Sequence, residues 1–409
     1  MKEFFKVTEL DQVLSYVDLF RPVGVEKVSI FDTPGRILAE NVMARENIPN
    51  FTRSTMDGFA IKASSSFGAS EASPAYLEIK GTISMGEIPD FSIGHGEAAR
   101  IATGGMLPSG ADAVVMVEHA DFLDDLTIEV YKSAAPGQHV IMEGEDIQES
   151  QEILFSGQKI RPQETGLLAA VGHHKIKVFK KPLVAIISTG DEVVGIHESP
   201  GFGQIRDINT YTLYGQVLQA GGIPKPYGIV HDNYQSLYEI CKKALDETDM
   251  VLISGGSSVG ARDYTIEVLS NMPDSEILVH GITISPGKPT ILAKSGGKPF
   301  WGIPGHVVSA MVVFESVTRF FLEKIAGFSP KYHQRFFCKA RMKRNIGSAQ
   351  GRVEYIRVRL KQENGVLWAE PILGKSGLIR TMIEADGLVA VDMNTEGLEK
   401  GEEVKVFPL

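Results

Sequence analysis

The chain has 409 residues, with 41 Lys and Arg against 51 Asp and Glu, so its formal net charge is −10 when histidine is neutral. A single domain usually holds about 100 to 200 residues, so this length predicts several domains. The acidic balance argues against nucleic acid or an anionic membrane as the partner, and an anionic ligand would need a local pocket of basic or backbone N–H groups.

The first residues are not expected to form a signal peptide, because Lys2, Glu3 and Lys6 interrupt any apolar core. No apolar run reaches the roughly 18 residues that a transmembrane helix needs. Cys241 and Cys338 lie far apart and lack the spacing of metal ligands, which is typical of reduced thiols. We therefore expect a cytoplasmic protein that binds neither membrane nor nucleic acid.

The first 178 residues predict two interleaved domains. Residues 48–145 carry short β-like runs separated by Gly, Pro, Asp and Ser turns, which indicates a small, mostly β domain inserted into another one. The flanking stretches 1–47 and 146–178 are expected to form one helical and extended linking domain. The expected elements are a helix at Glu9–Leu19, a helix or strand near Arg36–Asn41, strands at Ala75–Ile79, Ala113–Val117 and Leu126–Tyr131, and a helix at Arg161–Val171.

Residues 179–328 alternate buried apolar runs of strand length with amphipathic stretches of helix length. The expected strands are Leu183–Ile187, Pro226–Val230 and Met250–Ile253, and the expected helices are Asn209–Ala220, Asp232–Leu245, Asp263–Asn271 and Val307–Ala326. This alternation predicts an open, doubly wound α/β domain with parallel strands.

Residues 329–409 return to short strands separated by turns. The expected strands are Phe336–Met342, Glu354–Leu360, Val366–Ala369, Leu388–Val391 and Glu403–Val406. A compact β-barrel or sandwich accounts for this pattern. The fold class is therefore a multidomain combination of α/β and β domains.

Loops at the carboxyl ends of the α/β strands are the first candidates for a site, because ligands bind at that edge of an open sheet. The loop Ser254–Gly260 follows a buried strand and contains Gly255 and Gly256, whose backbone N–H groups could approach a phosphate closely. A tight turn that needs glycine only for its backbone angles is the alternative. The chain lacks the phosphate-binding patterns of P-loop and dinucleotide-binding proteins at this point.

Four carboxylates gather at the same strand ends, namely Asp191, Glu192, Asp232 and Asp263. Asp232 and Asp263 have an alternative role as helix N-caps, whereas Asp191 and Glu192 follow a strand directly. A phosphate ringed by carboxylates would be repelled unless a divalent cation lay between them, so the cluster predicts Mg²⁺.

Two further residues at this edge of the sheet are candidates for contact with an anionic ligand. Lys288 stands between Pro286 and Pro289 on a stiff loop, which favours anion contact over a solvated side chain. His306 is equally consistent with a helix start and with a ligand contact.

Several motifs extend this pattern over nearly the whole chain. They are Ile48–Ala60, Arg100–Gly104, Gly110–Val115, Gly144–Ile147, Ser188–Glu192, Asp207–Asn209, Ser254–Gly260, Asp263–Tyr264, Pro286–Pro289 and Pro304–Gly305. In this order they resemble the molybdopterin molybdenumtransferase family, which includes MoeA and the related domain of gephyrin. The resemblance implies a molybdopterin-binding type of α/β domain and a homodimer of four-domain subunits with a composite active site.

The resemblance also implies a reaction and a set of residues. Molybdate would enter adenylylated molybdopterin with release of AMP in the presence of Mg²⁺, and the enzyme that adenylylates the pterin is a further expected partner. The implied catalytic residues are Asp57 and Thr103 of one subunit with Glu192, Asp232 and Asp263 of the other, and these last three are the expected metal ligands. The expected substrate contacts are Gly190, Asp191, Asn209, Ser254, Gly255, Gly256, Ser257, Gly260, Pro286, Gly287, Lys288, Pro304, Gly305, Arg352 and Ser376.

The chain departs from the family at several basic positions. Ile141, Gly281 and Ser285 stand where family members commonly carry basic residues, and His306 replaces the asparagine of a Pro-Gly-Asn-Pro turn. Two alternatives to a molybdate insertase therefore stay open, a tungstate-preferring insertase and a non-catalytic scaffold that binds the pterin or a nucleotide. Asp57 also has a simpler interpretation, because an Asp before Gly is a common turn signal.

Overall fold

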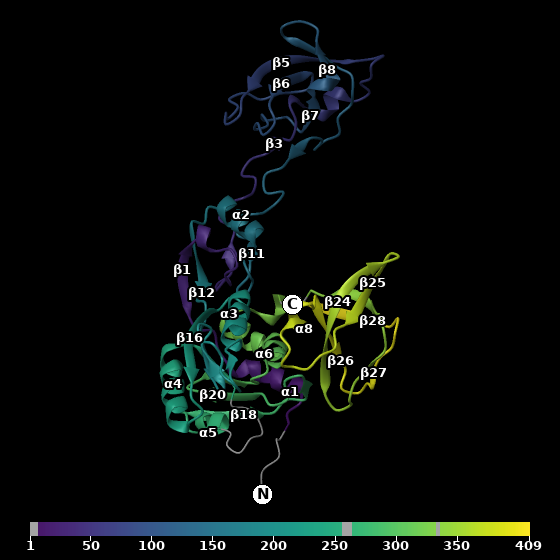
Figure 1. Cartoon of the computed structure of the whole chain (residues 1–409). Coiled ribbons are helices and arrows are strands. Elements are labelled where there is room, and N and C mark those ends of the chain that lie inside the picture. The colour runs from purple at the N-terminus through teal and green to yellow at the C-terminus, as the bar shows by residue number, and fades with distance from the viewer. Residues whose placement is uncertain (1–6, 256–263, 333–335) are drawn as a thin grey trace. The chain divides into compact units, whose positions relative to one another are not determined.

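The computed structural model describes residues 7–255, 264–332 and 336–409 (Figure 1). The chain divides into two compact units. One contains residues 1–40, 156–161 and 175–409, and the other contains 41–155 and 162–174. Within the described ranges, no helix has both the length and the apolar character that a membrane span requires.

The unit of residues 41–155 and 162–174 is mostly β, as expected for its central part. Its main sheet has the strand order β7-β4-β6-β5-β9-β8, and only β5 and β6 run parallel. The strands are β4 (Gly58–Ile61), β5 (Ala75–Ile83), β6 (Glu97–Ile101), β7 (Ala113–Met116), β8 (Ala120–Phe122) and β9 (Thr127–Val130). Phe59, Ile61, Leu77 and Ile128 pack into one core beside this sheet.

Shorter elements complete this unit. They are β2 (Val42–Met43) paired with β11 (Glu152–Leu154), β3 (Arg53–Ser54) paired with β10 (Val140–Ile141), and α2 (Pro162–Ala170). Pro162 opens α2, and Gly172 follows it with a positive φ of 74°, which confirms the expected helix start and stop.

The N-terminal part of the other unit confirms one expected element and corrects another. The helix expected at Glu9–Leu19 is present as α1 (Leu10–Ser15) followed by a 3-10 turn at Tyr16–Leu19. The regular element expected near Arg36–Asn41 was a wrong prediction, because Ile37 and Leu38 form only isolated bridges. Strand β1 (Val25–Ser29) pairs instead with β12 (Lys175–Phe179).

The α/β sheet has the order β16-β13-β17-β21-β20-β18. Strands β16 (Ile223–Val230), β13 (Leu183–Thr189) and β17 (Met250–Ser254) run parallel, as predicted. Strand β21 (Lys298–Ile303), which was not predicted, pairs with β17 and is also parallel. Strands β20 (Ile291–Ser295) and β18 (Ser275–His280) continue the sheet in antiparallel fashion. The sheet is therefore mixed, and its antiparallel edge is a correction to the expected all-parallel arrangement.

Helices cover both faces of this sheet because β13 is apolar on both sides. Val184 and Ile186 pack with α3 (Asn209–Gln219) and the long C-terminal helix, whereas Ala185 and Ile187 pack with α4 (Tyr234–Glu247) and α5 (Tyr264–Ser270). Trp301 lies fully buried on the α3 side. Cys241 is on the buried face of α4, where burial raises the pKa of its thiol, so this cysteine acts as a packing residue.

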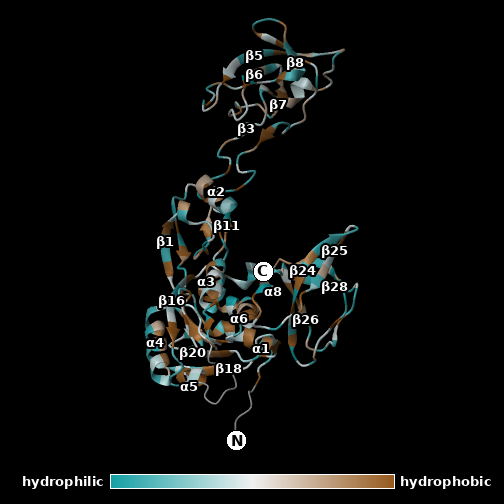
Figure 2. Ribbon diagram, viewed as in Figure 1, coloured by the Kyte–Doolittle hydropathy of each residue, from teal (hydrophilic) through white to brown (hydrophobic). Residues whose placement is uncertain are grey.

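The long helix expected at Val307–Ala326 is present with one local irregularity. It consists of α6 (Val307–Val313), a π-helical turn (Phe314–Thr318) and α7 (Arg319–Ile325). The apolar residues of α6 are brown in Figure 2 and are almost all buried. This helix forms one wall of the core and also carries the chain to the C-terminal domain.

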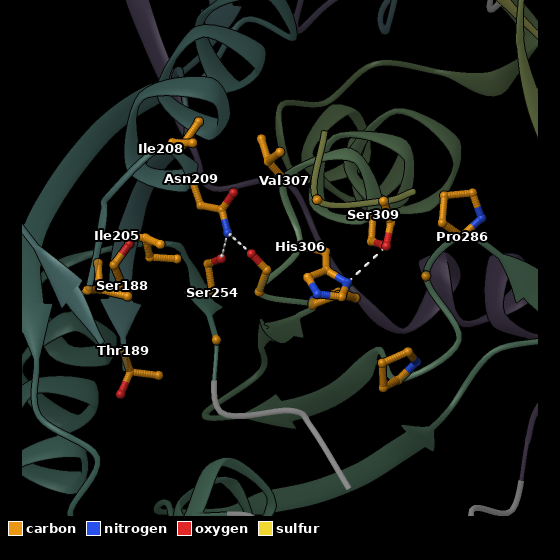
Figure 3. Close-up of a pocket in the computed structure, with 18 of the residues that line it drawn as sticks. Ser188, Thr189, Ile205, Ile208, Asn209, Ser254, Pro286, His306, Val307 and Ser309 are labelled. Carbon is orange, nitrogen blue, oxygen red and sulfur yellow. Dashed lines mark hydrogen bonds between the residues drawn. The ribbon is translucent and has the colours of Figure 1, made fainter. Parts of the chain in front are cut away.

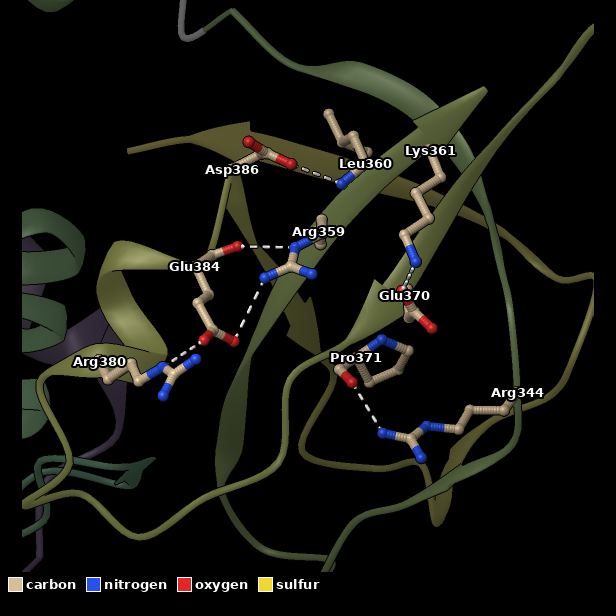
Figure 4. Close-up of polar contacts among 9 residues, drawn as sticks. All are labelled: Arg344, Arg359, Leu360, Lys361, Glu370, Pro371, Arg380, Glu384 and Asp386. Carbon is tan, nitrogen blue, oxygen red and sulfur yellow. Dashed lines mark hydrogen bonds and ion pairs between the residues drawn. The ribbon is translucent and has the colours of Figure 1, made fainter. Parts of the chain in front are cut away.

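The C-terminal domain is a barrel rather than a sandwich. Strand β24 pairs with both β25 and β26, and β22 and β28 join these two neighbours, so the sheet closes on itself. The strands are β22 (Cys338–Met342), β24 (Val353–Glu363), β25 (Val366–Pro371), β26 (Gly387–Val391) and β28 (Glu403–Pro408). Ion pairs on its surface include Arg359 with Glu384 at 3.2 Å and Lys361 with Glu370 at 2.6 Å (Figure 4).

The start of α4 corrects the expected role of Asp232. The N-cap of α4 is Asn233, whose side chain accepts a hydrogen bond from the backbone N of Ser236 at 2.9 Å. Asp232 turns back toward the sheet, where its Oδ1 accepts a hydrogen bond from Thr189 Oγ1 at 2.6 Å. Asp232 is therefore not needed as a cap and stands at the strand end where a ligand would bind.

Replacing the cap and its neighbour separately tests this assignment. Asn233→Ala should lower the free energy of unfolding by about 1 kcal/mol, because it removes the capping acceptor of α4. Asp232→Asn keeps an acceptor for Thr189 and should change that free energy by less than about 0.5 kcal/mol. Urea unfolding followed by Trp301 fluorescence in a Trp368→Phe background measures both. A loss with Asp232→Asn and none with Asn233→Ala would return the cap to Asp232.

Candidate active site

A cavity of about 720 Å³ opens at the carboxyl ends of β13, β17 and β21 (Figure 3). This is the edge of an open α/β sheet at which loops converge and ligands bind. Its described lining includes Ser188, Thr189, Glu192, Arg206, Asp207, Asn209, Ser254, Gly255, Pro286, Gly287, Lys288, Pro304, Gly305, His306, Arg352 and Ser376. Arg352 and Ser376 belong to the C-terminal domain, so the barrel contributes one wall.

The structure brings many of the expected residues into this cavity, but not all. Gly190, Asp191 and Asp232 lie beside the lining residue Thr189 without lining the cavity themselves. Asp57 and Thr103 belong to the other compact unit. The expected contacts Gly256, Ser257 and Gly260 and the expected catalytic and metal ligand Asp263 lie outside the described residues.

Two glycines with positive φ shape the strand ends at the cavity. Gly255 has a φ of +110°, and a Cβ there would lie 2.1 Å from the carbonyl oxygen of Thr189. Gly190 has a φ of +145°, and a Cβ there would lie 2.8 Å from a carboxylate oxygen of Glu192. A side chain at Gly255 would push the ends of β17 and β13 apart, whereas one at Gly190 would displace the side chain of Glu192 and strain the turn.

The side-chain amide of Asn209 connects three elements at the cavity floor. Its Nδ2 donates to Ser254 Oγ at 2.6 Å and to the carbonyl oxygen of Gly305 at 2.8 Å (Figure 3). The carbonyl oxygen can only accept, so it fixes the orientation of the amide. Asn209 Oδ1 is buried and has no hydrogen-bond partner among the described residues. This oxygen is therefore an unsatisfied buried acceptor in a residue that lines the cavity.

Asp207 is a lining residue that the sequence analysis did not assign to the site. It is buried, and its Oδ1 accepts hydrogen bonds from Ser188 Oγ at 2.9 Å and from the backbone N of Thr210 at 3.1 Å. The carboxylate therefore joins the end of β13 to the first turn of α3. Its place in the motif Asp207–Asn209 was the available signal, although a motif alone does not distinguish a supporting residue from a contact.

The acidic residues form a short chain of contacts at the cavity rim. Asp232 accepts from Thr189, and Asp191 Oδ1 lies 3.2 Å from the backbone N of Asp232 and 3.3 Å from His231 Nδ1. Asp191 is exposed, and Glu192 reaches the cavity lining. Within the described ranges, no group of at least three His, Cys, Asp or Glu side chains forms a metal site, and the expected third carboxylate is not among these residues.

Positive charge reaches the cavity from several directions. Lys288 comes from the loop after β19 (Ile284–Ser285), Arg206 from β15 (Ile205–Arg206), and Arg352 from the C-terminal domain. His306 is the N-cap residue of α6, as one of its two expected roles required, and it also lines the cavity, where a ligand contact stays a prediction. Its Nδ1 lies 2.9 Å from Ser376 Oγ, which ties the barrel to the start of α6.

Asp57 and Thr103 form an independent pair in the mostly β unit. Asp57 Oδ1 accepts from the backbone N of Thr103 at 2.6 Å and from its Oγ1 at 2.9 Å. These two bonds, the backbone one first, hold the pKa of Asp57 below its ordinary value of 3.8. Asp57 is thus an ionised, oriented and exposed carboxylate, which a turn signal alone did not predict.

Three family models and several curated proteins match this chain. Residues 8–172 match the model of the MoeA N-terminal region (domain I and II), residues 185–324 match a probable molybdopterin binding domain, and residues 339–409 match the MoeA C-terminal region (domain IV). A putative molybdopterin biosynthesis protein of Methanocaldococcus jannaschii is 38% identical over 395 residues, which cover 94% of this chain and 92% of that protein. The chain belongs to the MoeA family.

Other MoeA-family proteins agree over the full length. A molybdopterin molybdenumtransferase of Staphylococcus epidermidis is 31% identical, with coverage of 93% of this chain and 90% of that one. The crystal structure of a molybdopterin biosynthesis MoeA protein from Pyrococcus horikoshii OT3 superimposes with a TM-score of 0.83 at 30% identity, covering 99% of this chain and 100% of that one. Membership in this family connects the chain to molybdenum cofactor biosynthesis and to transferase chemistry.

The Asp57–Thr103 pair makes a prediction about pH. A carboxylate whose pKa is lower in the folded state stabilises the fold above its unfolded pKa, and this contribution is lost as the pH falls through the folded pKa. A ¹³C NMR titration should therefore give Asp57 a midpoint below 3.8. Thr103→Val removes the hydroxyl bond but keeps the stronger backbone bond, so it should raise the midpoint only in part. A wild-type midpoint at or above the ordinary value would contradict the assigned hydrogen bonds.

Proposed function

We propose that the protein inserts molybdate into the dithiolene of adenylylated molybdopterin and releases AMP, with Mg²⁺ as the cofactor. The observation that carries this proposal is the composition of the main cavity. It combines close backbone approach at Gly255, a buried unpaired acceptor on Asn209, and cations from Lys288 and Arg352. Its volume of about 720 Å³ lies within the roughly 300 to 1,000 Å³ of small-molecule sites.

The donor set supports Mg²⁺ as the expected cation. Glu192, Asp232 and Asp263 would hold it, since hard divalent cations prefer carboxylate oxygens. Glu192 already lines the cavity, and Asp232 has one oxygen engaged by Thr189 and the other without a partner among the described residues. When bound, Mg²⁺ supplies positive charge that allows a phosphate to lie beside these acids.

Different residues of the main cavity would contact different parts of the substrate. Lys288, Arg352 and Ser376 would receive an oxyanion, because charged and hydroxyl donors favour oxygen atoms with negative charge. Asn209 Oδ1 would accept a hydrogen bond from the organic part of the substrate, which satisfies a buried acceptor that costs about 1–3 kcal/mol when left unpaired. Asp207 would not touch substrate, since its contacts hold Ser188 and Thr210 in place.

We further propose a homodimer in which Asp57 and Thr103 of a second copy complete the site. Asp57 is held ionised and exposed by Thr103, which suits a group that acts on a ligand rather than one that only closes a turn. The finer division into a linking domain of residues 1–47 and 146–178, an inserted domain of 48–145, an α/β domain of 179–328 and a barrel of 329–409 belongs to the same proposal.

The identity of the oxyanion substrate has an alternative, which is tungstate in place of molybdate. Ser285 is a neutral lining residue at a position where family members are expected to have a basic residue. His306 lies within hydrogen-bond distance of Ser376. This altered set of donors favours a test of tungstate beside molybdate. A non-catalytic scaffold would bind the pterin equally well but would release no AMP.

Substitution of the acids tests the catalytic proposal. The purified protein, given adenylylated molybdopterin, Mg²⁺ and molybdate, should release AMP, and Glu192→Gln or Asp232→Asn should reduce that rate by at least about a hundredfold. Glu239→Gln, at an exposed residue of α4, is the matched control and should keep the wild-type rate. Wild-type rates in both site variants would leave the acids without a catalytic role, and no AMP release from the wild type would favour the scaffold.

Removal of the cavity cation tests the oxyanion site. Lys288→Ala should raise the KM for the oxyanion by roughly ten- to a hundredfold, since a hydrogen bond to a charged group is worth about 1.5–3 kcal/mol. His306→Ala should change the ratio of the molybdate and tungstate KM values, because it frees Ser376. Lys242→Ala, on the exposed side of α4, serves as the control. An unchanged KM for both oxyanions in Lys288→Ala would remove this lysine from the site.

A further inference from the structure

A second cavity, of about 580 Å³, lies near the amino-terminal ends of strands β13 and β16, whereas the main cavity lies at the carboxyl ends of the strands. It is lined by the turn after α3, the end of α7 and the segment Phe179–Lys181, which leads into β13. The main cavity lies at the other end of β13, beyond Thr189. A strand of this length spans about 20 Å, so the two cavities are separate sites.

This second cavity is strongly basic although the chain is acidic overall. Its described lining contains the cations Arg36, Lys159, Arg161, Lys180, Lys181, Arg319 and Lys331, and one acid, Glu323. Arg36 pairs with Glu26, and Arg319 pairs with Glu315 at 2.7 Å and with Glu323 at 2.8 Å. These three carboxylates offset the charges of Arg36 and Arg319, which leaves Lys159, Lys180 and Lys181 as positive charges of the lining.

Helix ends do not cancel that charge. The C-termini of α3 and α7 point into the same region, and each carries a partial charge of about −0.5, so together they offset only about one positive charge of the lining. In the described part of the chain, no carboxylate forms an ion pair with Lys159, Lys180 or Lys181. A solvated surface lysine needs no partner, but a concave wall focuses the field of several cations on one volume.

The rigid part of the cavity is aromatic as well as basic. Arg36 is fixed by Glu26 and also donates to the carbonyl oxygen of Phe179 at 2.9 Å. The Phe179 ring lies against Gly327, where a Cβ would come within 2.1 Å of the ring. Phe328 is a second aromatic residue of the lining. Two aromatic side chains therefore share the lining with cations that arrive from segments far apart in the sequence.

We propose that this second cavity binds a phosphorylated aromatic ligand of the nucleotide class, separately from the substrate of the main cavity. Lys159, Lys180 and Lys181 would contact the phosphates, since they are exposed and lack ion-pair partners within the described ranges. The aromatic residues Phe179 and Phe328 would contact the base. A cavity of about 580 Å³ is too large for a single phosphate and falls within the usual size of a small-molecule site.

Binding to the full-length protein tests this proposal. Isothermal titration with ATP should show a salt-sensitive site that the double variant Lys180→Ala and Lys181→Ala weakens by at least about tenfold. Lys288→Ala, which alters only the main cavity, and Lys242→Ala, on the exposed side of α4, should leave that site intact. Photo-crosslinking with an azido-adenine nucleotide should label the segment around Phe179 in the wild type but not in the double variant.

Three outcomes would overturn the proposal. Equal ATP affinity in the wild type and the double variant would show that these lysines do not bind the ligand. Equal affinity for ATP and for inorganic phosphate or pyrophosphate would reduce the cavity to a general anion patch without a base subsite. A double variant that changes the oligomeric state without changing ATP affinity would assign the cavity to contacts between copies of the chain.

The test is independent of the reaction proposed for the main cavity. The double variant should keep the wild-type rate of AMP release at saturating substrate, provided that its far-ultraviolet circular dichroism and Trp301 fluorescence match the wild type. Loss of AMP release in Glu192→Gln with ATP binding unchanged would support both proposals. A wild type that binds ATP in the second cavity but releases no AMP would contradict only the proposed insertase activity.

Discussion

The amide group of Asn209 is the interaction on which the shape of the main cavity depends. It lies at the first residue of α3 and donates to Ser254 at the end of β17 and to Gly305 after β21, so one buried side chain holds three chain segments. Both amide hydrogens are used, and the oxygen remains without a partner among the described residues. Because an unpaired buried acceptor is costly, this arrangement favours a ligand that brings a donor.

Electrostatics divides the cavity into two regions. Asp191, Glu192 and Asp232 lie around the end of β13, with Arg206 as the one described cation of the lining on that side, whereas Lys288 and Arg352 approach from the loop after β19 and from the barrel. Such a separation suits a ligand that carries both phosphate and a second anion, since a cation can sit on the acidic side and an oxyanion on the basic side. The barrel is thus part of the site, because the His306–Ser376 contact fixes its wall against α6.

Strand and helix periodicity predicted most of the fold, and it failed where neighbouring residues compete. The antiparallel strands β18 and β20 were missed because Glu276 in β18 and Lys294 in β20 interrupt the continuous apolar runs that identified β13 and β17. At α4 the sequence offers Asp232 and Asn233 as adjacent caps, and propensity cannot separate two good capping residues. Tertiary contact with Thr189 decides the question, since it draws Asp232 toward the sheet.

The sequence by itself determined the class of the domains, the strand ends that carry glycines and acids, and the family, because these depend on local patterns and ordered motifs. It could not place Ser376 against His306, or join Arg36, Lys180 and Arg319 around one basic cavity, because these residues lie far apart along the chain. Only the packing of the barrel against α6, and of β12 and its flanking turn against the end of α7, brings them together. Long-range packing therefore decided which charges share a cavity, and that is the property on which binding depends.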